Sequence, residues 1–288
     1  MTKPTVLLQL DTDAQASVFD SLVAIDSGVD HLLRHQGVTP ESVRDLVYGA
    51  MFTRGPEHLK RTAIFVGGSD AGLAEKVAQR AKECYFGPVR VSILLDPNGA
   101  NTTAAAAVLA AEKHLPLAGS EAIVLAATGP VGRRAVRLLA RAGAMVRVAS
   151  RRLDRAQEVC QEVAELVDGA KLAPHDTSSD QGLRTALDGA QLVIAAGPPG
   201  VELIGTPFAS NGGTVRVAID LNAVPPAGIS GVESSDRAEE RNGVVCYGAL
   251  GVGGTKMKIH KAAVAKLFTT NDLILDAEEI FQIGRELK

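Results

Sequence analysis

A glycine-containing loop at residues 127–132, with the sequence ATGPVG, is the first stretch whose residue types could do chemistry. It lies between an apolar run, EAIVL, and a helix-like run, RRAVRLLARAGA. A strand, a glycine-rich turn and a helix in this order point backbone N–H groups and the positive helix end at one spot, which favours an anion. We therefore predict phosphate binding by Thr128, Gly129, Pro130, Val131 and Gly132.

The glycine spacing matches the dinucleotide-binding pattern G-x-G-x-x-G except at its first position, which is Ala127. Gly129 would let the backbone approach a pyrophosphate, and Gly132 would let the helix pack closely on the strand. Pro130 suits the first helical position, where no N–H partner is needed. Ala127 is tolerable if the turn keeps a negative φ there. The alternative is a tight turn that binds nothing.

About twenty residues after the loop, the next apolar run ends in Ser150, Arg151 and Arg152. An acid at this place would hold the ribose 2′-hydroxyl of NAD. A hydroxyl and two guanidinium groups instead suit a 2′-phosphate, through charge-assisted hydrogen bonds. The pattern therefore predicts NADP as the cofactor. The alternative is a solvated helix start, in which Asp154 pairs with either arginine.

Two further loops rich in glycine and proline follow apolar runs, AAGPPG at 195–200 and DLNAVPPAGI at 220–229. The carboxyl edge of a parallel sheet is where the nicotinamide half of the cofactor should lie. We predict cofactor contacts from Ala196, Gly197 and Asn222. A rigid turn without a ligand is the alternative for both loops.

Apolar runs alternate with helical patterns along the whole chain, which indicates βαβ units and a parallel sheet. Ser17 can cap a helix, and Thr39-Pro40-Glu41 can start another with proline at the first helical position. We predict an α/β fold with two domains, a substrate domain at 1–103 and a doubly wound Rossmann-type domain at 104–269. The last helix, within 270–288, should pack back on the first domain, because chain ends often lie close together.

Composition excludes several classes of function. The net charge is −3, aromatic residues make up 3% and tryptophan is absent, so neither nucleic acid nor a membrane surface is an expected partner. No apolar run is long enough for a membrane span or a signal peptide. Cys84, Cys160 and Cys246 are too scattered for a zinc site, and His31 and His35 lack the glutamate of a zincin motif. We expect a cytoplasmic protein without a metal.

Several stretches together resemble the bacterial NADP-dependent methylene-tetrahydromethanopterin dehydrogenases, whose relatives also use methylene-tetrahydrofolate. They cover nearly the whole chain in order. Ala127 departs from the glycine that relatives often have. The resemblance implies an N-terminal pterin-binding domain, a Rossmann domain, an active-site cleft between them, and a homo-oligomer (a dimer, trimer or hexamer). The stretches are LDTDAQASVFD, TAIFVGG, YFGPVRVSILLDPNGANTTAAA, ATGPVG, SRRLDRAQ, DLNAVPPAGI and GALGVGGTKMKIHKA.

The reaction that the resemblance implies needs no general base. A nitrogen lone pair expels hydride from the methylene carbon and leaves a methenyl cation, so the protein has to position two rings and tolerate positive charge. Phe19 would pack on the pterin, and Asp20 would take its ring N–H groups or offset the cation. By themselves these two residues favour a helix cap and a core phenylalanine. Lys256 would open a helix after a flexible glycine stretch and reach a substrate oxygen. The remaining predicted substrate contacts are Asp13, Asn98 and Thr102.

Three other functions stay open. A shikimate dehydrogenase-like oxidation needs a Lys–Asp acid–base pair, for which Lys60 and Asp96 are the candidates. A glutamyl-tRNA reductase-like reaction needs a nucleophilic cysteine, and Cys84 is a poor candidate. A non-catalytic NADP sensor would bind the cofactor without turnover. The sequence does not distinguish the two pterins, the direction of the reaction, or an added cyclohydrolase activity.

Overall fold

The computed structural model describes residues 3–205 and 213–287, and the chain divides into two compact units. Unit 1 comprises Met1–Thr102 and Met257–Lys288, and unit 2 comprises Thr103–Lys256. The chain re-enters unit 1 at Met257, earlier than the predicted residue 270. The reason is that helix α8 (Ala249–Lys266) runs without a break through a glycine-rich segment that we expected to interrupt it.

Unit 1 is built on a five-stranded parallel sheet in the order β12-β4-β3-β1-β2. The two edge strands have no apolar run in the sequence: β2 is mostly exposed and β12 has two residues. They join the sheet through pairing with an interior strand, which the local pattern does not encode. The strands are β1 (Val6–Asp11), β2 (His31–His35), β3 (Thr62–Gly67), β4 (Ser92–Leu95) and β12 (Ile274–Leu275).

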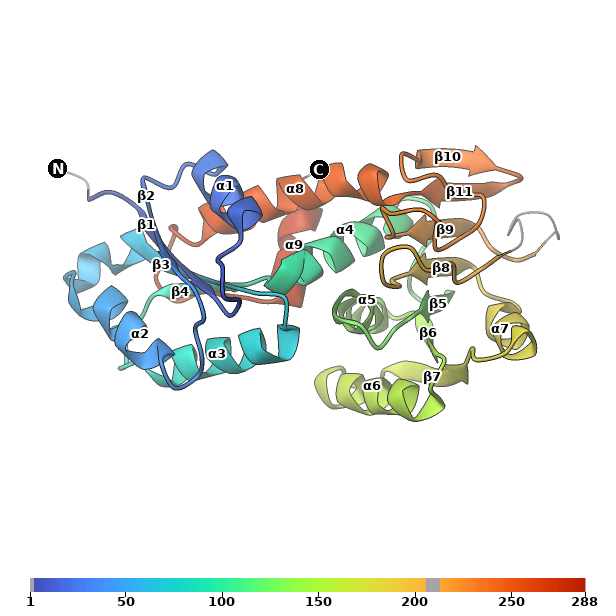
Figure 1. The fold of residues 1–288 in the computed structure, drawn as a ribbon, viewed down its shortest axis with the longest axis horizontal. Coiled ribbons are helices and arrows are strands. Elements are labelled where there is room, and N and C mark those ends of the chain that lie inside the picture. Colours follow the sequence, from blue (N-terminus) through green and yellow to red (C-terminus); the bar gives the residue numbers. More distant parts are fainter. Residues whose placement is uncertain (1–2, 206–212, 288) are drawn as a thin grey trace. The chain divides into compact units, whose positions relative to one another are not determined.

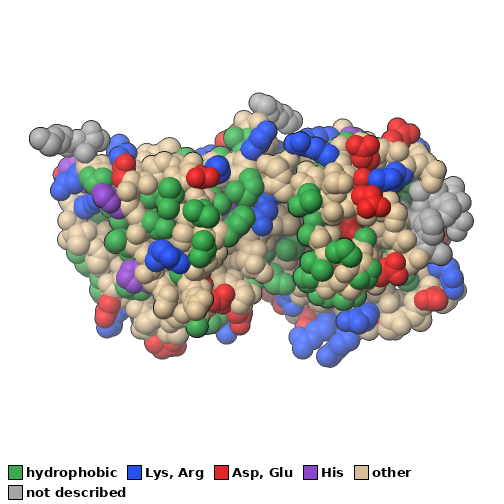
Figure 2. All heavy atoms as spheres, turned by 45° about the horizontal axis from the view of Figure 1, so that its top comes forward, with side chains coloured by type: hydrophobic (Ala, Val, Ile, Leu, Met, Phe, Trp, Pro, Cys, Tyr) green, Lys and Arg blue, Asp and Glu red, His purple; other side chains and the backbone are tan. Residues whose placement is uncertain are grey.

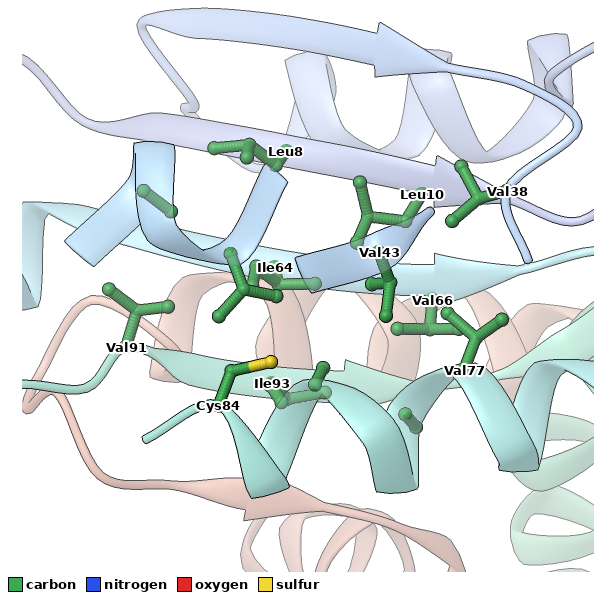
Figure 3. Close-up of a cluster of buried hydrophobic side chains, with 14 of the residues drawn as sticks. Leu8, Leu10, Val38, Val43, Ile64, Val66, Val77, Cys84, Val91 and Ile93 are labelled. Carbon is green, nitrogen blue, oxygen red and sulfur yellow. The ribbon is translucent and has the colours of Figure 1, made fainter. Parts of the chain in front are cut away.

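The two faces of this sheet differ in chemistry. Alternate residues such as Leu8, Ile64 and Ile93 join an apolar core with helices α2 (Val43–Phe52) and α3 (Ala71–Glu83) (Figure 3). Because side chains alternate along a strand, the intervening residues Gln9, Asp11 and Phe65 point to the other face. That face is covered by helix α1 (Val18–Asp26) and the C-terminal half of α8 (Figure 1).

The two predicted helix starts in unit 1 have different outcomes. The cap is confirmed, because the Ser17 hydroxyl accepts a hydrogen bond from the Asp20 N–H. The start at Thr39-Pro40-Glu41 is wrong by one turn, since α2 begins at Val43. Thr39 and Ser42 instead exchange side-chain and backbone hydrogen bonds that close a turn before the helix. The remaining short elements of unit 1 are the 3-10 helices η1 (Pro56–Arg61) and η2 (Pro97–Gly99), and helix α9 (Ala277–Glu286).

Unit 2 is a seven-stranded sheet in the order β10-β11-β9-β8-β5-β6-β7, parallel except for the β10–β11 pair. The chain runs outward from β5 through β6 to β7 and then returns to β8 on the other side of β5. This reversal confirms the predicted doubly wound fold. The strands are β5 (Glu121–Leu125), β6 (Met145–Ser150), β7 (Lys171–Asp176), β8 (Leu192–Ala195), β9 (Val217–Asp220), β10 (Arg237–Arg241) and β11 (Val244–Tyr247).

The helices of unit 2 connect these strands. Helix α4 leads into the sheet and starts in unit 1, so it and α8 are the two elements that belong to both units. Across the described residues, no helix is long and apolar enough to cross a membrane. The remaining bounds are α4 (Ala100–Glu112), α5 (Pro130–Arg141), α6 (Leu153–Leu166) and α7 (Asp180–Leu187).

Candidate active site

The predicted phosphate loop joins β5 to α5 as expected. Gly129 is the N-cap of α5, Pro130 is the first helical residue, and no side chain caps this helix end. The left-handed backbone falls on Ala126, with φ of 53°, and not on Ala127. The replacement of the first glycine by Ala127 is therefore compatible with the turn. The first turn of α5 presents uncapped backbone N–H groups, which is what an anion site requires.

The two glycines of the loop leave different amounts of space. A Cβ on Gly132 would lie 2.7 Å from Cα of Ala127, so this residue has to be glycine for the helix to pack on the strand end. A Cβ on Gly129 would meet only the carbonyl oxygens of Ala126 and Ala196, at 3.7 Å and 3.9 Å. The protein itself therefore has room for a side chain at Gly129, and the surface there is open to a ligand.

The loop lies at the point where the strand order reverses. Strands β5 and β8 are neighbours, and the Ala196 N–H donates to the Leu125 carbonyl oxygen at 3.1 Å. Gly197 follows at the same edge, in close contact with Leu203. In doubly wound sheets, ligands bind at the carboxyl edge beside this reversal. The predicted residues Gly129, Ala196 and Gly197 therefore meet at one edge.

Arg133 is a part of this loop that we did not predict. Its Nε donates to the Thr128 carbonyl oxygen at 3.0 Å, and its guanidinium also pairs with Glu162 on α6. The side chain thereby fixes the carbonyl of the loop away from the uncapped helix end. The only signal in the sequence for this contact is the Arg-Arg pair after Gly132, and the pair does not indicate which way the Arg133 side chain points.

At the end of β6, Ser150 is buried and orders the turn, and the arginines that follow it are exposed. Ser150 is buried, and its hydroxyl accepts a hydrogen bond from the Arg152 N–H at 3.1 Å. The Arg152 guanidinium pairs with Asp154, with Nε 3.2 Å from Oδ1, and this pairing lowers the pKa of Asp154. The Arg151 side chain is exposed. The alternative in which Asp154 takes an arginine thus applies to Arg152. Both arginine side chains are exposed, and Arg151 is the one that does not pair with Asp154.

Asn222 holds two loops together. Its side-chain oxygen accepts from the Gly200 and Val224 N–H groups, and its amide nitrogen donates to the Pro226 carbonyl oxygen. The side chain is buried, so the structure shows a loop contact rather than the predicted ligand contact. Asp220 at the end of β9 supports the same loop by accepting from the Gly228 N–H. Burial raises the pKa of Asp220, and the backbone donors oppose that rise.

In unit 1, buried polar groups of β1 fix the first turn of α1. The Gln9 amide nitrogen donates to the Ser17 carbonyl oxygen, and its oxygen accepts from the Ser21 hydroxyl. Asp11 accepts from the Ser17 N–H at 2.8 Å. These bonds hold the N-terminal end of α1 over the end of β1, and Phe19 lies in that turn.

Phe19 and Asp20 point in different directions from this turn. Phe19 is 49% exposed, and Val18 and Leu22 of the same helix are exposed too. Figure 2 shows that hydrophobic and charged side chains are mixed on the face that it draws. Phe19 is therefore not the core phenylalanine that its residue type alone favours. Asp20 is only 7% exposed, and a Cβ on Gly67 would lie 3.6 Å from its Oδ2. The same Cβ would lie only 2.9 Å from Cε1 of Phe65, so the absence of a side chain at Gly67 lets the Phe65 ring pack beside this buried carboxylate.

The turn after β4 contains two predicted substrate residues with different exposure. Asn98 is exposed and has a left-handed backbone with φ of 52°, which asparagine tolerates. Thr102 is completely buried, and its hydroxyl donates to Asp96 at 2.7 Å. Asp96 also accepts from the N–H groups of Asn101 and Thr102 at the start of α4. The structure places Thr102 in the support of the turn and not at a surface that a substrate could touch.

Lys256 differs from its predicted setting, whereas the substrate contact of Asp13 stays a prediction. The Asp13 carboxylate accepts hydrogen bonds from the N–H and the hydroxyl of Ser69, and so joins the loops after β1 and β3. Lys256 does not open a helix, because α8 begins at Ala249 and includes the glycines before the lysine. One of these glycines packs closely: a Cβ on Gly251 would lie 1.8 Å from the Asp236 carbonyl oxygen, whereas one on Gly253 would meet nothing within 4 Å.

Comparison with known proteins gives the family. The family model described as methylene-tetrahydromethanopterin dehydrogenase, N-terminal, matches residues 18–98. The chain is 42% identical over 284 residues to the bifunctional protein MdtA of Methylorubrum extorquens strain AM1, covering 98% of each chain. It is 28% identical to the NAD(P)-dependent methylenetetrahydromethanopterin dehydrogenase of the same organism, again covering 98% of each. The chain belongs to the methylene-tetrahydromethanopterin dehydrogenase family.

The fold of this family member is shared with other dehydrogenases. A crystal structure of shikimate 5-dehydrogenase from Listeria monocytogenes, in complex with shikimate and NAD, aligns with a TM-score of 0.54. The sequence identity is 14%, and the alignment covers 99% of this chain and 96% of that one. At this identity the likeness shows the two-domain dehydrogenase fold alone.

The residues required by two of the rival reactions are badly placed. Lys60 precedes β3 at its amino end, whereas Asp96 follows β4 at the carboxyl edge of the same parallel sheet. The length of a six-residue strand, about 20 Å, separates such ends, so the two cannot form an acid–base pair. Cys84 lies in the core of unit 1, and burial raises the pKa of its thiol, the opposite of what a nucleophile needs. No cluster able to hold a metal ion occurs among the described residues.

Proposed function

We propose that this protein oxidises the methylene group of methylene-tetrahydromethanopterin, or of methylene-tetrahydrofolate, with NADP in one-carbon metabolism. The observation that supports this most strongly is where the family model matches. Its residues, 18–98, lie in unit 1 and not in the Rossmann-type unit that many dehydrogenases share. They include Phe19, Asp20 and Asn98, so the match concerns the proposed substrate side of the protein.

The residues of unit 2 fit NADP. The open space at Gly129 and the uncapped first turn of α5 suit a pyrophosphate, which would bind to the N–H groups of Val131 and Gly132. The exposed Arg151 suits the 2′-phosphate, supported by the turn that Ser150 orders. When bound, the nicotinamide supplies the acceptor for a hydride ion.

The residues of unit 1 fit a reaction that builds positive charge. The exposed ring of Phe19 provides a flat apolar surface for a pterin, and the buried carboxylate of Asp20 provides negative charge beside Gly67 at the end of β3. Lys256, on α8, would contact a carbonyl or carboxylate of the substrate. Asn98 is the exposed polar group of the turn after β4 and would contact the substrate from there.

The chemistry needs orientation and electrostatics and no proton transfer. The methylene C–H bond breaks, its electron pair leaves with the hydrogen as hydride, and a nitrogen lone pair forms the C=N⁺ bond of the methenyl product. Asp20 stabilises this cation, and a fixed negative charge in a poorly solvated place does so effectively. Phe19 holds the ring plane so that the reacting C–H bond is aligned.

The test is an absorbance assay with NADP and each of the two methylene pterins, followed at the wavelengths of NADPH and of the methenyl product. We expect equal formation of both products, and the ratio of the two kcat/KM values names the preferred pterin. Tight NADP binding without turnover of either pterin would contradict the proposal and favour a sensor. Turnover of shikimate instead would favour the alcohol dehydrogenase alternative.

Two predictions accompany this function. We propose a homo-oligomer, which light scattering of the purified protein would establish, and a single monomer mass would contradict it. We also propose a cytoplasmic location, which fractionation of the native cells would test. Both agree with the family, and neither enters the argument for the reaction.

A further inference from the structure

His260 on α8 occupies a central place in unit 1 that the proposed reaction does not yet use. The side chain is 1% exposed. Its ring stacks on Phe65 of β3, with centroids 5.7 Å apart and planes inclined by 25°. The same ring lies 6.4 Å from the ring of Phe19, inclined by 38°. His260 is therefore the middle ring of three that run from the buried sheet face to an exposed ring at the proposed pterin surface.

The polar edge of the imidazole faces the turn after β4. Nδ1 of His260 lies 3.9 Å from Oδ2 of Asp96, which is completely buried. This distance exceeds that of a hydrogen bond. The Asp96 oxygens accept instead from Thr102 and Asn101, as described above. The His260 ring therefore stacks on Phe65 and has the Asp96 carboxylate at one edge.

His260 lies on the part of α8 that contacts α1. The next residue, Lys261, pairs with Asp26 at the C-terminal end of α1, with Nζ 2.9 Å from Oδ2. One turn earlier on the same helix, Lys256 lies at the i−4 position and shares a helix face with His260. A change in the packing of the His260 ring would therefore alter the orientation of the Phe19 ring. It would also rotate α8 and so change the direction of the Lys256 side chain.

We propose that His260 is a positioning residue for the pterin reaction, and that it acts through its ring by holding Phe19. The proposal rests on the function proposed above. Phe19 is half exposed, and the buried ring of His260 is a contact that can hold its ring plane. Displacement of a reacting group by about 1 Å costs about a hundredfold in rate, which is why such support matters.

The experiment compares His260→Ala, His260→Phe and His260→Asn with the wild-type protein, in steady-state kinetics with the methylene pterin and NADP. The Ala variant removes the ring, Phe keeps a ring of similar size, and Asn keeps a polar group near the Nδ1 position. We expect kcat/KM for the pterin to fall by about 10- to 100-fold for Ala and Asn, and Phe to recover most of it. The Kd of NADP, measured by titration, should not change.

His114 provides the matched control. It is an exposed histidine of unit 2 that also makes a ring contact: its Nε2 lies 2.8 Å from the Tyr247 hydroxyl oxygen, with ring centroids 5.6 Å apart. His114→Ala should lower Tm in the same way but leave the kinetics with pterin unchanged. A double-mutant cycle of His260→Ala with Phe19→Leu tests whether His260 acts through Phe19. We expect the two losses not to add, because both remove the same ring contact.

The outcomes separate this inference from the proposed function. Full activity of His260→Ala in a protein that turns over the pterin would overturn only the inference. Recovery by Asn and not by Phe, or additive losses in the cycle, would also overturn it, since the effect would then not pass through the rings. A wild-type protein that neither binds nor turns over a pterin would overturn both.

Discussion

The two candidate sites are made in different ways, although both lie at the carboxyl edge of a parallel sheet. In unit 2, the phosphate site consists of backbone: Gly129 leaves open space and the first turn of α5 has no side-chain cap. In unit 1, the site consists of side chains such as Asp20, on a helix turn that the side chains of Gln9 and Asp11 hold in place. Phosphate is recognised by N–H groups that every residue has, whereas a ring that becomes positive needs a carboxylate.

This difference has a consequence for robustness. The phosphate site of unit 2 tolerates most substitutions, except those whose side chains fill the space for the ligand. The charged residues of this site act independently of one another. The side-chain site is a connected network, in which removal of one member changes the setting of the next. The expected effects of single substitutions therefore differ between the units, and four predictions test this, from the largest effect to the smallest.

The largest effect is expected from Asp20→Asn. Loss of a preorganised charge beside a developing cation costs about 2.7–4 kcal/mol, so kcat should fall by about 100- to 1000-fold. The measurement is the absorbance assay, with the Kd of NADP as a second readout that should not change. Asp26→Asn is the matched control on the same helix: its exposed pair with Lys261 is a surface ion pair, which contributes little. Equal effects of both would contradict the role of Asp20.

The second prediction sets two glycines of one loop against each other. Gly132→Ala should lower both Tm and NADP affinity, because its Cβ would lie 2.7 Å from backbone, and such overpacking costs about 1–3 kcal/mol. Gly129→Ala should leave Tm unchanged and weaken NADP binding by at least about tenfold, or 1.4 kcal/mol. Differential scanning and NADP titration measure the two quantities. Unchanged NADP affinity in Gly129→Ala would exclude the pyrophosphate from this place.

The third prediction concerns the cofactor choice. Arg151→Ala should weaken NADP by about 10- to 100-fold, since a hydrogen bond to a charged group contributes about 1.5–3 kcal/mol, and should hardly affect NAD. Arg152→Ala should have a smaller effect on NADP, because this guanidinium already pairs with Asp154. Titrations of both variants with both cofactors measure this. Equal weakening of NADP and NAD by Arg151→Ala would count against a 2′-phosphate site.

The smallest effect is expected from the alanine with a left-handed backbone. Ala126→Gly should raise the free energy of unfolding by about 0.5–1 kcal/mol, because glycine adopts this conformation without strain. Ala127→Gly, one residue along, is the control and should lower it by about 0.4–1 kcal/mol through the entropy of the unfolded chain. Urea denaturation of the two variants would show changes of opposite sign. The same sign for both would contradict the assignment of the turn.

Particular residues show how much of the structure could be predicted from the sequence. The strand, the turn and the start of α5 were predictable, because the types and spacing of six neighbouring residues set that backbone. The start of α2 was placed one turn too early, since Thr39 can close a turn as well as cap a helix. Lys256 was expected to follow a flexible segment, but its glycines permit close packing within a helix, and sequence does not distinguish these two uses of glycine.

The sequence alone therefore determined the two-domain α/β order, the phosphate loop and the arginines, because each depends on residues close together in the chain. Only the tertiary structure decided that Thr102 and Asn222 are buried in loop supports, that Phe19 is exposed beside a buried Asp20, and that His260 reaches Phe65 from a distant helix. The physical reason is that burial and ring contacts depend on which elements pack together. That choice is made by the whole sheet and its covering helices, and no local pattern of residues encodes it.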